Sequence, residues 1–250
     1  MKPNHLLLAS AAILASAACN AQQGSDSSSG ATSTPVEAVQ PPANGDWSSV
    51  VTQTTANGFM MGNPDAKVKL IEFASMTCPH CAEFDKAAVP QLAERYVKGG
   101  QVSYELRNYV RDPFDIAVSL IARCNGAQSF FPLTHAFFRD QSDWIGKFQT
   151  VPEAQIEQIT NMGPERQFVE IAKVAGLQQF AAMRGVPTAK STQCLTDQQA
   201  VNQLVQMNSD ATNQFPTLPG TPSFVINGEL QESTSTWQLL EPKIREALGS

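Results

Sequence analysis

Apolar and polar residues follow two different periods in the centre of this chain. Residues 67–74 are largely apolar, which predicts a buried strand, and residues 102–109 alternate in the manner of a second strand. Residues 78–97 between them are mostly good helix formers, and the pair Gly99-Gly100 ends this segment. Its apolar side chains recur at every fourth position: Phe84, Ala88, Leu92 and Tyr96. The strand–helix–strand order predicts two parallel strands joined by a right-handed crossover.

Short apolar segments on either side of this unit predict further strands. Residues 50–51 and 59–61 indicate a short N-terminal strand or strand pair. Residues 221–226 predict another strand, followed by an Asn-Gly turn and a second short strand at 229–230. Residues 236–248 then predict an amphipathic helix that closes the chain.

Between these two regions the pattern is helical for about ninety residues after Asp112-Pro113. The helical segments that it predicts are 114–124, 130–140, 153–160, 165–174, 177–184 and 197–207. Strand patterns return afterwards, so this stretch is expected to be an all-helical insertion and not a separate terminal domain. We therefore divide the folded part into a first α/β portion (47–111), a helical insertion (112–210) and a second α/β portion (211–250).

The N-terminus is typical of an exported protein. Lys2 precedes an apolar run at 6–18 that is too short to span a bilayer and ends in small residues, so residues 1–18 are predicted to be a signal peptide. Cys19 directly after this run suggests lipidation as an alternative to a soluble exported form. Residues 19–46 are rich in Gln, Ser, Gly, Thr, Ala and Pro without an apolar face, which predicts a flexible polar tether.

Composition narrows the function classes. A chain of 250 residues with 42% apolar residues can bury a full core, as one domain with an insertion or as two domains. The net charge of −6 at pH 7 argues against a basic surface for nucleic acid or anionic lipid. Charged residues make up only 16% of the chain, which also suits an exported protein.

The candidate chemistry lies in Cys78-Pro79-His80-Cys81, between the predicted strand 67–74 and the helix after it. Cys78 is expected near the N-cap, with Pro79 at the first helical position. Unpaired backbone amides and the helix dipole would stabilise a thiolate on Cys78, and the thiolate is the form that attacks disulfides. Cys81 is close enough to form a disulfide with Cys78, and His80 could add a donor or a positive charge.

Two other interpretations of the Cys-x-x-Cys pair remain open. It could be half of a zinc site, but such a site needs another close pair, whereas Cys124 and Cys194 are far apart and His135 stands alone. It could also be a purely structural disulfide. We expect a redox pair, and no metal or cofactor.

These residues together resemble the DsbA-like thiol:disulfide oxidoreductases of the bacterial cell envelope. The resemblance rests on Glu72 ahead of the Cys-Pro-His-Cys motif, the helical insertion, and Gly220-Thr221-Pro222 before a strand and an Asn-Gly turn. It covers residues 60–247 and implies a thioredoxin fold with an all-helical insertion domain. The activity that it implies is disulfide exchange with exported proteins.

The resemblance also implies a role for each site residue. Cys78 would be the solvent-facing attacking cysteine and Cys81 the buried resolving cysteine. Glu72 would be a buried carboxylate that helps proton transfer at Cys81, although a solvent-facing strand residue is the alternative. Pro222 would be a cis-proline opposite the disulfide, with Thr221 offering backbone hydrogen bonds to an extended substrate. Thr221 departs from the Val usual in the best-known oxidases and is similar to isomerase-type relatives.

Cys124 and Cys194 both fall in the helical insertion. Free thiols are uncommon in exported proteins, so a structural disulfide between them is favoured, with two separate buried thiols as the alternative. Some alphaproteobacterial relatives that this chain resembles carry such a second disulfide.

The function that we predict is a dithiol oxidase of the periplasm or cell envelope, soluble or lipid-anchored. The expected partners are unfolded or reduced exported proteins and a membrane redox partner that resets the active site. The tether in place of a dimerisation domain favours a monomer. A disulfide isomerase or reductase on the same fold is one alternative, and a chaperone-like module that binds unfolded clients is another.

Overall fold

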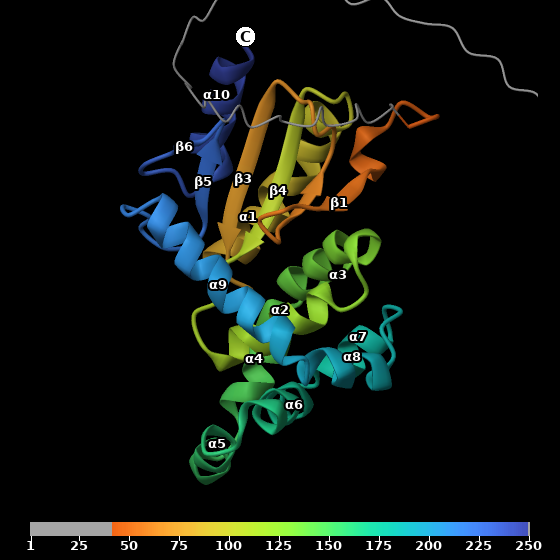
Figure 1. Cartoon of the computed structure of the whole chain (residues 1–250), viewed down its shortest axis with the longest axis vertical. Helices are drawn as coiled ribbons and strands as arrows, with labels where there is room; N and C mark the ends of the chain where they lie inside the picture. The colour runs from red at the N-terminus through yellow and green to blue at the C-terminus, as the bar shows by residue number, and fades with distance from the viewer. Residues whose placement is uncertain (1–41, 250) are drawn as a thin grey trace, which may run out of the picture. The chain divides into compact units, whose positions relative to one another are not determined.

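The structure is a computed structural model that describes residues 42–249. Its strands form one mixed sheet in the order β1-β2-β4-β3-β5-β6 (Figure 1). The strands are β1 (Val51–Gln53), β2 (Phe59–Met61), β3 (Val68–Ala74), β4 (Val102–Asn108), β5 (Ser223–Ile226) and β6 (Glu229–Leu230). Every predicted strand segment is present, and 50–51 and 59–61 belong to an antiparallel pair.

The centre of the sheet is the parallel pair β3 and β4. Val68 lies opposite Val102 and Ala74 opposite Asn108, so the parallel pairing predicted from the strand–helix–strand order is confirmed. β5 pairs with the other edge of β3 in the antiparallel sense, with Phe73 opposite Ser223. This pairing brings the residues just before β5 close to the end of β3.

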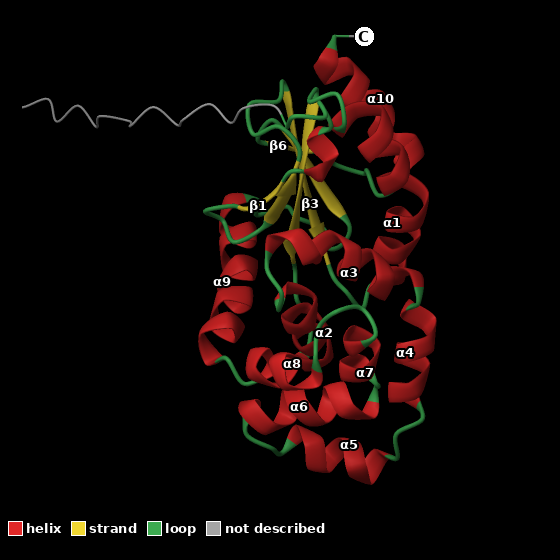
Figure 2. Cartoon of the chain, turned by 90° about the vertical axis from the view of Figure 1, so that its right-hand side faces the viewer, coloured by secondary structure: helices red, strands yellow, loops and turns green. Residues whose placement is uncertain are grey.

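Helices cover both faces of the sheet. Seen edge-on in Figure 2, α9 lies on one side, and α1 and α10 lie on the other. The helices of the α/β portion are η1 (Trp47–Ser49), α1 (Pro79–Leu92), η2 (Ala93–Val97) and α10 (Trp237–Leu248). The predicted helix 78–97 is thus an α-helix that contains Pro90 and ends in a π-helical turn, in which the Lys98 amide donates to the Ala93 carbonyl.

The insertion consists of helices, which confirms the α/β class with an all-helical insertion. These are α2 (Pro113–Arg123), α3 (Ala127–Arg139), α4 (Gln141–Gln149), α5 (Glu153–Thr160), α6 (Pro164–Val174), α7 (Leu177–Ala182), α8 (Thr188–Leu195) and α9 (Gln198–Gln214). Two of them, α4 and α8, were not predicted, and α9 is longer than the predicted 197–207. Most of these helices lie beyond the carboxyl end of β3, where the Cys-x-x-Cys motif follows (Figure 1).

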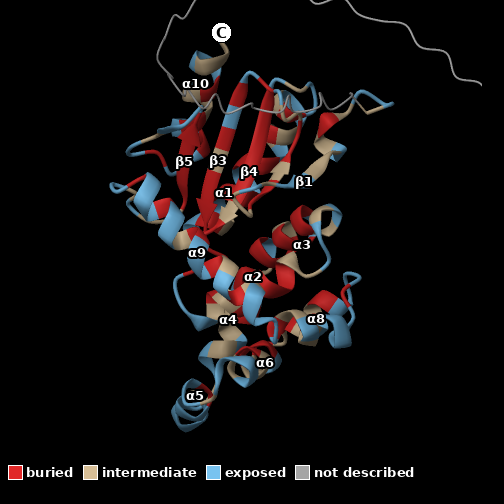
Figure 3. Ribbon diagram, viewed as in Figure 1, coloured by how far each residue is buried: buried red, intermediate tan, exposed pale blue. Residues whose placement is uncertain are grey.

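Two groups of buried side chains hold the fold together. The larger group joins the sheet to α1, α10 and the insertion, and includes Leu70, Phe84 and Tyr104. The smaller group lies under α9 on the other face, where Phe73 and Val225 pack against Phe215. Figure 3 shows β3, β4 and β5 as largely buried, whereas α5 is mostly exposed.

Within residues 42–249, no helix combines the length and the apolar character needed to cross a membrane.

Candidate active site

The two cysteines of the motif lie where β3 gives way to α1. Cys78 is the N-cap residue of α1, and its extended backbone lets its carbonyl accept from the amide of Ala82 at 3.2 Å. Pro79 occupies the first helical position, where its missing N–H leaves no hydrogen bond unmade. Both thiols are free, so the structure represents the reduced dithiol.

Cys78 is more covered than the sequence suggested. We expected it to face the solvent, but only 4% of the residue is exposed, compared with 0% for Cys81. Thr221 accounts for part of this cover, because its carbonyl oxygen lies 3.2 Å from the Cys78 sulfur. Cys78 remains the outer cysteine of the two, although access to its sulfur is narrow.

The two thiols have opposite acidities. The pKa of Cys78 is lowered to about 5, and the hydrogen bond from the Cys81 thiol is the largest cause. Thr221 and the amides of Cys81 and His80 lower it further, whereas burial opposes the shift. Burial raises the pKa of Cys81 well above that of an ordinary thiol, and its bond to Cys78 and the charge of Glu72 raise it further. At neutral pH the dithiol therefore carries a thiolate on Cys78 and a proton on Cys81.

Glu72 is buried in β3, with 1% of the residue exposed. Burial raises the pKa of its carboxyl to about 8, and the charges of Asp85 and Cys78 act in the same direction. The hydroxyl of Tyr104 donates to Glu72 Oε2 at 2.5 Å and opposes this rise. A carboxyl with these properties is protonated at neutral pH and can give its proton to a thiolate at Cys81.

Tyr104 was not singled out in the sequence, although one signal was available. It is a residue with a polar tip in a strand expected to pair in parallel with the strand of Glu72. In the observed register Leu70 lies opposite Tyr104, two residues before Glu72. Side chains two residues apart point to the same face of a sheet, so Tyr104 and Glu72 meet there.

Thr221 and Pro222 lie beside the dithiol, and the peptide bond between them is cis. Gly220 before them has φ of 135°, a conformation that favours glycine, and its carbonyl accepts from the Ser223 hydroxyl at 2.7 Å. Phe224 of β5 packs against Phe84 of α1 with ring centroids 4.5 Å apart. The loop before β5 is thus fixed next to Cys78, and the substrate-binding roles of Thr221 and Pro222 stay predictions.

The His80 imidazole contacts Glu83. It is largely exposed, and its Nδ1 lies 3.3 Å from Glu83 Oε2, one turn along α1. The group of His80 that acts on Cys78 is its backbone amide. The sequence analysis had considered the His80 side chain for stabilising the thiolate, whereas in the structure the His80 backbone amide has this effect.

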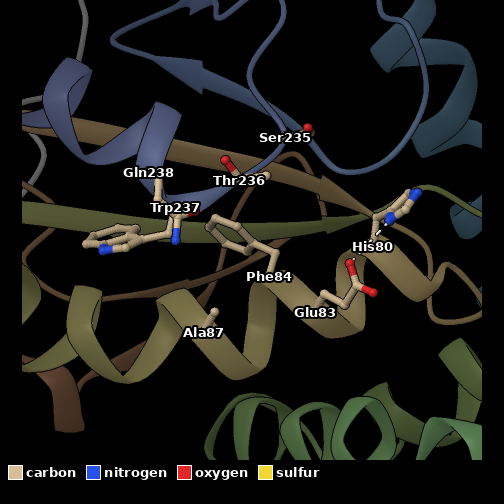
Figure 4. A pocket seen from close by; sticks show the side chains of 8 residues that line it. All are labelled: His80, Glu83, Phe84, Ala87, Ser235, Thr236, Trp237 and Gln238. Carbon is tan, nitrogen blue, oxygen red and sulfur yellow. Dashed lines mark hydrogen bonds and ion pairs between the residues drawn. The ribbon is translucent and has the colours of Figure 1, made fainter.

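A groove of about 410 Å³ runs alongside His80 between α1 and the start of α10 (Figure 4). Its lining is formed by His80, Glu83, Phe84, Ala87, Ser235, Thr236, Trp237 and Gln238. The rings of Phe84 and Trp237 give it an apolar floor, and hydroxyl, amide and carboxylate groups stand around them. This mixture suits an extended peptide with an apolar side chain.

The helical insertion contacts the loop in front of Cys78, which the sequence analysis did not foresee. Asp115 of α2 is fully buried and accepts from the Ser75 hydroxyl and from the Met76 amide. Gln141 of α4 donates to the carbonyls of Met76 and Cys78. Asp115 stands in the first turn of a predicted helix, which marks it only as a helix-start residue, and the helix of Gln141 was not predicted.

Cys124 and Cys194 form a disulfide that links the end of α2 to α8. His135, which stands alone in the sequence, bonds through Nδ1 to Asp85 of α1. In residues 42–249 no group of three or more His, Cys, Asp and Glu side chains is arranged to hold a metal ion. The predicted signal peptide 1–18, Cys19 and most of the predicted tether lie outside the described residues.

The chain is similar to known proteins over most of its length. A family model described as Thioredoxin matches residues 54–245. A Rickettsia bellii protein named “Putative protein-disulfide oxidoreductase” is 28% identical over 180 residues, which cover 72% of this chain and 60% of the relative. This chain thus spans about 60% of the length of that relative.

Two solved structures are similar in fold. The crystal structure of a protein-disulfide isomerase from Novosphingobium aromaticivorans is 37% identical, with a TM-score of 0.73, covering 76% of this chain and 97% of that one. Wolbachia pipientis alpha-DsbA1 is 22% identical, with a TM-score of 0.57, covering 77% and 92% of the two chains. The chain belongs to the thioredoxin family, and its fold is the DsbA-like form in which a helical insertion interrupts the thioredoxin fold.

Proposed function

We propose that this protein is a thiol:disulfide oxidoreductase that exchanges the Cys78–Cys81 disulfide with other proteins. The observation that carries the proposal is the opposite acidity of two thiols in one Cys-x-x-Cys motif, with the pKa of Cys78 near 5 and that of Cys81 well above the ordinary value. This difference in pKa favours Cys78 as the thiol that attacks and leaves easily, and Cys81 as the thiol that must be protonated on release.

The exchange can be written with this chain's own groups. A substrate thiolate attacks the Cys78 sulfur of the disulfide, which forms a mixed disulfide and releases Cys81 as a thiolate. Glu72, protonated at neutral pH, gives a proton to Cys81. The second substrate thiolate then attacks the substrate sulfur of the mixed disulfide and releases Cys78 as a stable thiolate. The substrate dithiol has been oxidised, and the Cys78–Cys81 disulfide has been reduced.

The oxidase direction is supported by the acidity of Cys78. A stabilised thiolate stabilises the reduced protein, and therefore makes the disulfide form a stronger oxidant. Isomerisation is the second candidate, because the 37% identical Novosphingobium protein is named a protein-disulfide isomerase. Thr221, whose carbonyl oxygen lies 3.2 Å from the Cys78 sulfur, stands where Val is usual in the best-known oxidases that the chain resembles.

The substrates that we propose are reduced, unfolded polypeptides. His80, which lines the groove between α1 and α10, is two residues from Cys78 in the sequence. The apolar floor of the groove suits a side chain of an unfolded segment. A membrane redox partner would use the same face to reset the dithiol, because both reactions require contact with Cys78. We propose a monomer in this cycle.

Oxidation of a reduced two-cysteine peptide, with glutathione disulfide to reset the enzyme, tests the proposal. Wild-type protein should accelerate disulfide formation, and Cys78→Ser should abolish the acceleration. A matched variant, Cys124→Ser with Cys194→Ser, should keep it because that pair lies in the insertion. Refolding of a scrambled substrate, assayed in parallel, separates isomerase from oxidase. Full activity of a folded Cys78→Ser protein would refute the function.

We propose that the protein works outside the cytosol, in the periplasm or cell envelope, since a reducing cytosol would open the Cys124–Cys194 disulfide. Export as a lipoprotein anchored through Cys19 is the finer proposal. Metabolic labelling with a fatty-acid analogue tests it: label on wild type that is lost in Cys19→Ala supports the anchor. An unlabelled mature protein that begins beyond Cys19 would instead be a soluble exported enzyme.

A further inference from the structure

The loop before the helix of the dithiol, residues 75–78, is held mainly by the helical insertion. We call these four residues the active-site loop. Within the loop, the Cys78 amide donates to the Ser75 carbonyl at 3.1 Å. The Thr77 amide also donates to the Ser75 hydroxyl at 3.3 Å. Further side-chain contacts to the loop come from α2, from α4 and from Arg111, two residues before α2.

Gln141, the first residue of α4, makes the most direct contact. Its side chain is buried, with 6% of the residue exposed. Its Nε2 donates to the Met76 carbonyl at 2.9 Å and to the Cys78 carbonyl at 3.0 Å. One amide group thus fixes the peptide planes on both sides of the Thr77–Cys78 unit.

Asp115 and Arg111 fix the remainder of the active-site loop. Asp115 Oδ1 accepts from the Met76 amide at 2.9 Å, and Oδ2 accepts from the Ser75 hydroxyl at 2.5 Å. Arg111 Nη2 donates to the Thr77 hydroxyl at 2.8 Å, and the Arg111 amide donates back to Asp115. Every residue of the loop therefore has a hydrogen bond to Gln141 or Asp115 of the insertion, or to Arg111 at the end of the first α/β portion.

We propose that the helical insertion, together with Arg111 just before it, sets the reactivity of Cys78 by holding the active-site loop, with Gln141, Asp115 and Arg111 as positioning residues. The inference rests on the proposed function, in which Cys78 is the attacking thiol. None of the three side chains has a recorded contact with the Cys78 sulfur. They act through the backbone that carries it.

The geometry of the N-cap links these contacts to the acidity of Cys78. The Cys81 thiol does most to stabilise the Cys78 thiolate, and the amides of Cys81 and His80 in the first turn of α1 add to it. These bonds require the extended Cys78 backbone, with φ of −85° and ψ of 121°. The Cys78 carbonyl accepts from Gln141 at 3.0 Å and from the Ala82 amide at 3.2 Å, and the two bonds together restrain ψ of Cys78. Without the Gln141 contact this restraint is weaker, so the sulfur is held less closely to the two amides and the thiol becomes less acidic.

Alkylation of Cys78 by iodoacetamide as a function of pH tests the proposal on the full chain. The active-site pair is opened with one equivalent of reductant, and the labelled peptide is measured by mass spectrometry. Gln141→Leu should raise the midpoint of labelling by about one pH unit, the equivalent of one lost hydrogen bond, and slow labelling at pH 5 about fivefold. Asp115→Asn should shift the midpoint in the same direction, because an amide cannot accept both bonds.

Gln178→Leu is the matched control. Its Nε2 bonds to Thr188, Ser191 and Thr192, all within the insertion, so its loss weakens the insertion without releasing the active-site loop. Gln178→Leu should lower the melting temperature and leave the labelling midpoint in place. Gln141→Leu with a lower melting temperature but an unchanged midpoint would overturn the proposal, since the contact would then be structural only.

Arg111→Ala decides the matter if neither Gln141→Leu nor Asp115→Asn folds. The Arg111 side chain is 42% exposed, so its removal should be tolerated. A rise in the labelling midpoint supports the proposal and an unchanged midpoint overturns it. A wild-type midpoint near that of an ordinary thiol would instead refute the proposed function, so the two failures are distinguishable.

Discussion

Replacing Glu72 with Gln should remove a pH dependence of stability that burial of this carboxyl creates. The Glu72→Gln variant keeps the size of the side chain and a hydrogen-bond acceptor for Tyr104, but it cannot ionise. In the wild type, burial raises the pKa of Glu72 to about 8, against 4.5 for the ordinary side chain. The folded protein therefore holds a proton over a pH range in which the unfolded chain has released it.

The sign and size of the effect follow from this difference. A carboxyl whose pKa is raised by folding favours the folded state at low pH, and this contribution is lost as pH rises through the folded value. The loss is about 1.4 kcal/mol for each pH unit between the two values, or up to about 5 kcal/mol in all for a pKa near 8. Stability of the wild type relative to Glu72→Gln should thus fall between pH 4.5 and about 8, and level off above that.

Urea unfolding from pH 5 to pH 9 measures the difference, and urea suits the purpose because it is uncharged. Both proteins should carry Cys78→Ser and Cys81→Ser, so that no active-site thiol titrates. This background also makes a reductant unnecessary, which leaves the Cys124–Cys194 disulfide intact. A constant difference in unfolding free energy across the whole range would show that Glu72 is ionised throughout, and the account of its burial would be wrong.

Further predictions concern Tyr104, Cys78 and the Cys124–Cys194 disulfide. Tyr104→Phe removes the hydroxyl that opposes the rise, so the pKa of Glu72 should move further up by about one pH unit, as followed by ¹³C NMR of the labelled carboxyl. The rate of Cys78 alkylation in wild-type protein should rise with a midpoint near pH 5, and a midpoint above pH 8 would contradict the assigned thiolate. Replacing both Cys124 and Cys194 with Ser opens a loop of 70 residues and should lower the unfolding free energy by about 4 kcal/mol in urea, while peptide oxidation at low temperature is retained.

Sequence periodicity placed the ends of some elements closely. Residues 153–160 were predicted as a helix with the same ends as α5, and the strand 67–74 differs from β3 by one residue. In contrast, α4 and α8 carry few apolar residues, and α8 has only Ser191 and Leu195 buried. Their patterns are too weak to predict a helix without the packing around them.

The end of α9 shows the same limit of local periodicity. Its predicted end at residue 207 lies seven residues before the observed end at Gln214. The additional turns are polar apart from Ala211, which packs with Phe215 against Phe73 and Val225 of the sheet. A contact with strands far away in sequence therefore stabilises the last turns of α9, and such contacts are absent from local periodicity.

The same distinction between local pattern and distant contacts applies to the candidate site. Cys78 and Cys81 were found because a short motif and the strand–helix boundary place them together. Tyr104 and Gln141 were missed because they reach the site through sheet register and through an unpredicted helix. Local sequence thus locates the two cysteines and the amides beside them, whereas the contacts of Tyr104 and Gln141 come from distant segments and require the fold.

The proton positions in the dithiol explain why these distant groups matter for direction. At neutral pH the negative charge lies on Cys78, and both Cys81 and Glu72 hold protons. The Cys78 thiolate is one of the charges that raises the pKa of Glu72, so its disappearance on oxidation makes Glu72 a stronger acid. In the exchange that we propose, Glu72 is a better proton donor while Cys78 carries no charge, which is when Cys81 leaves as a thiolate. Once the thiolate stands on Cys78, the pKa of Glu72 rises again, so a carboxylate that has given its proton to Cys81 takes one back from solvent before the next cycle.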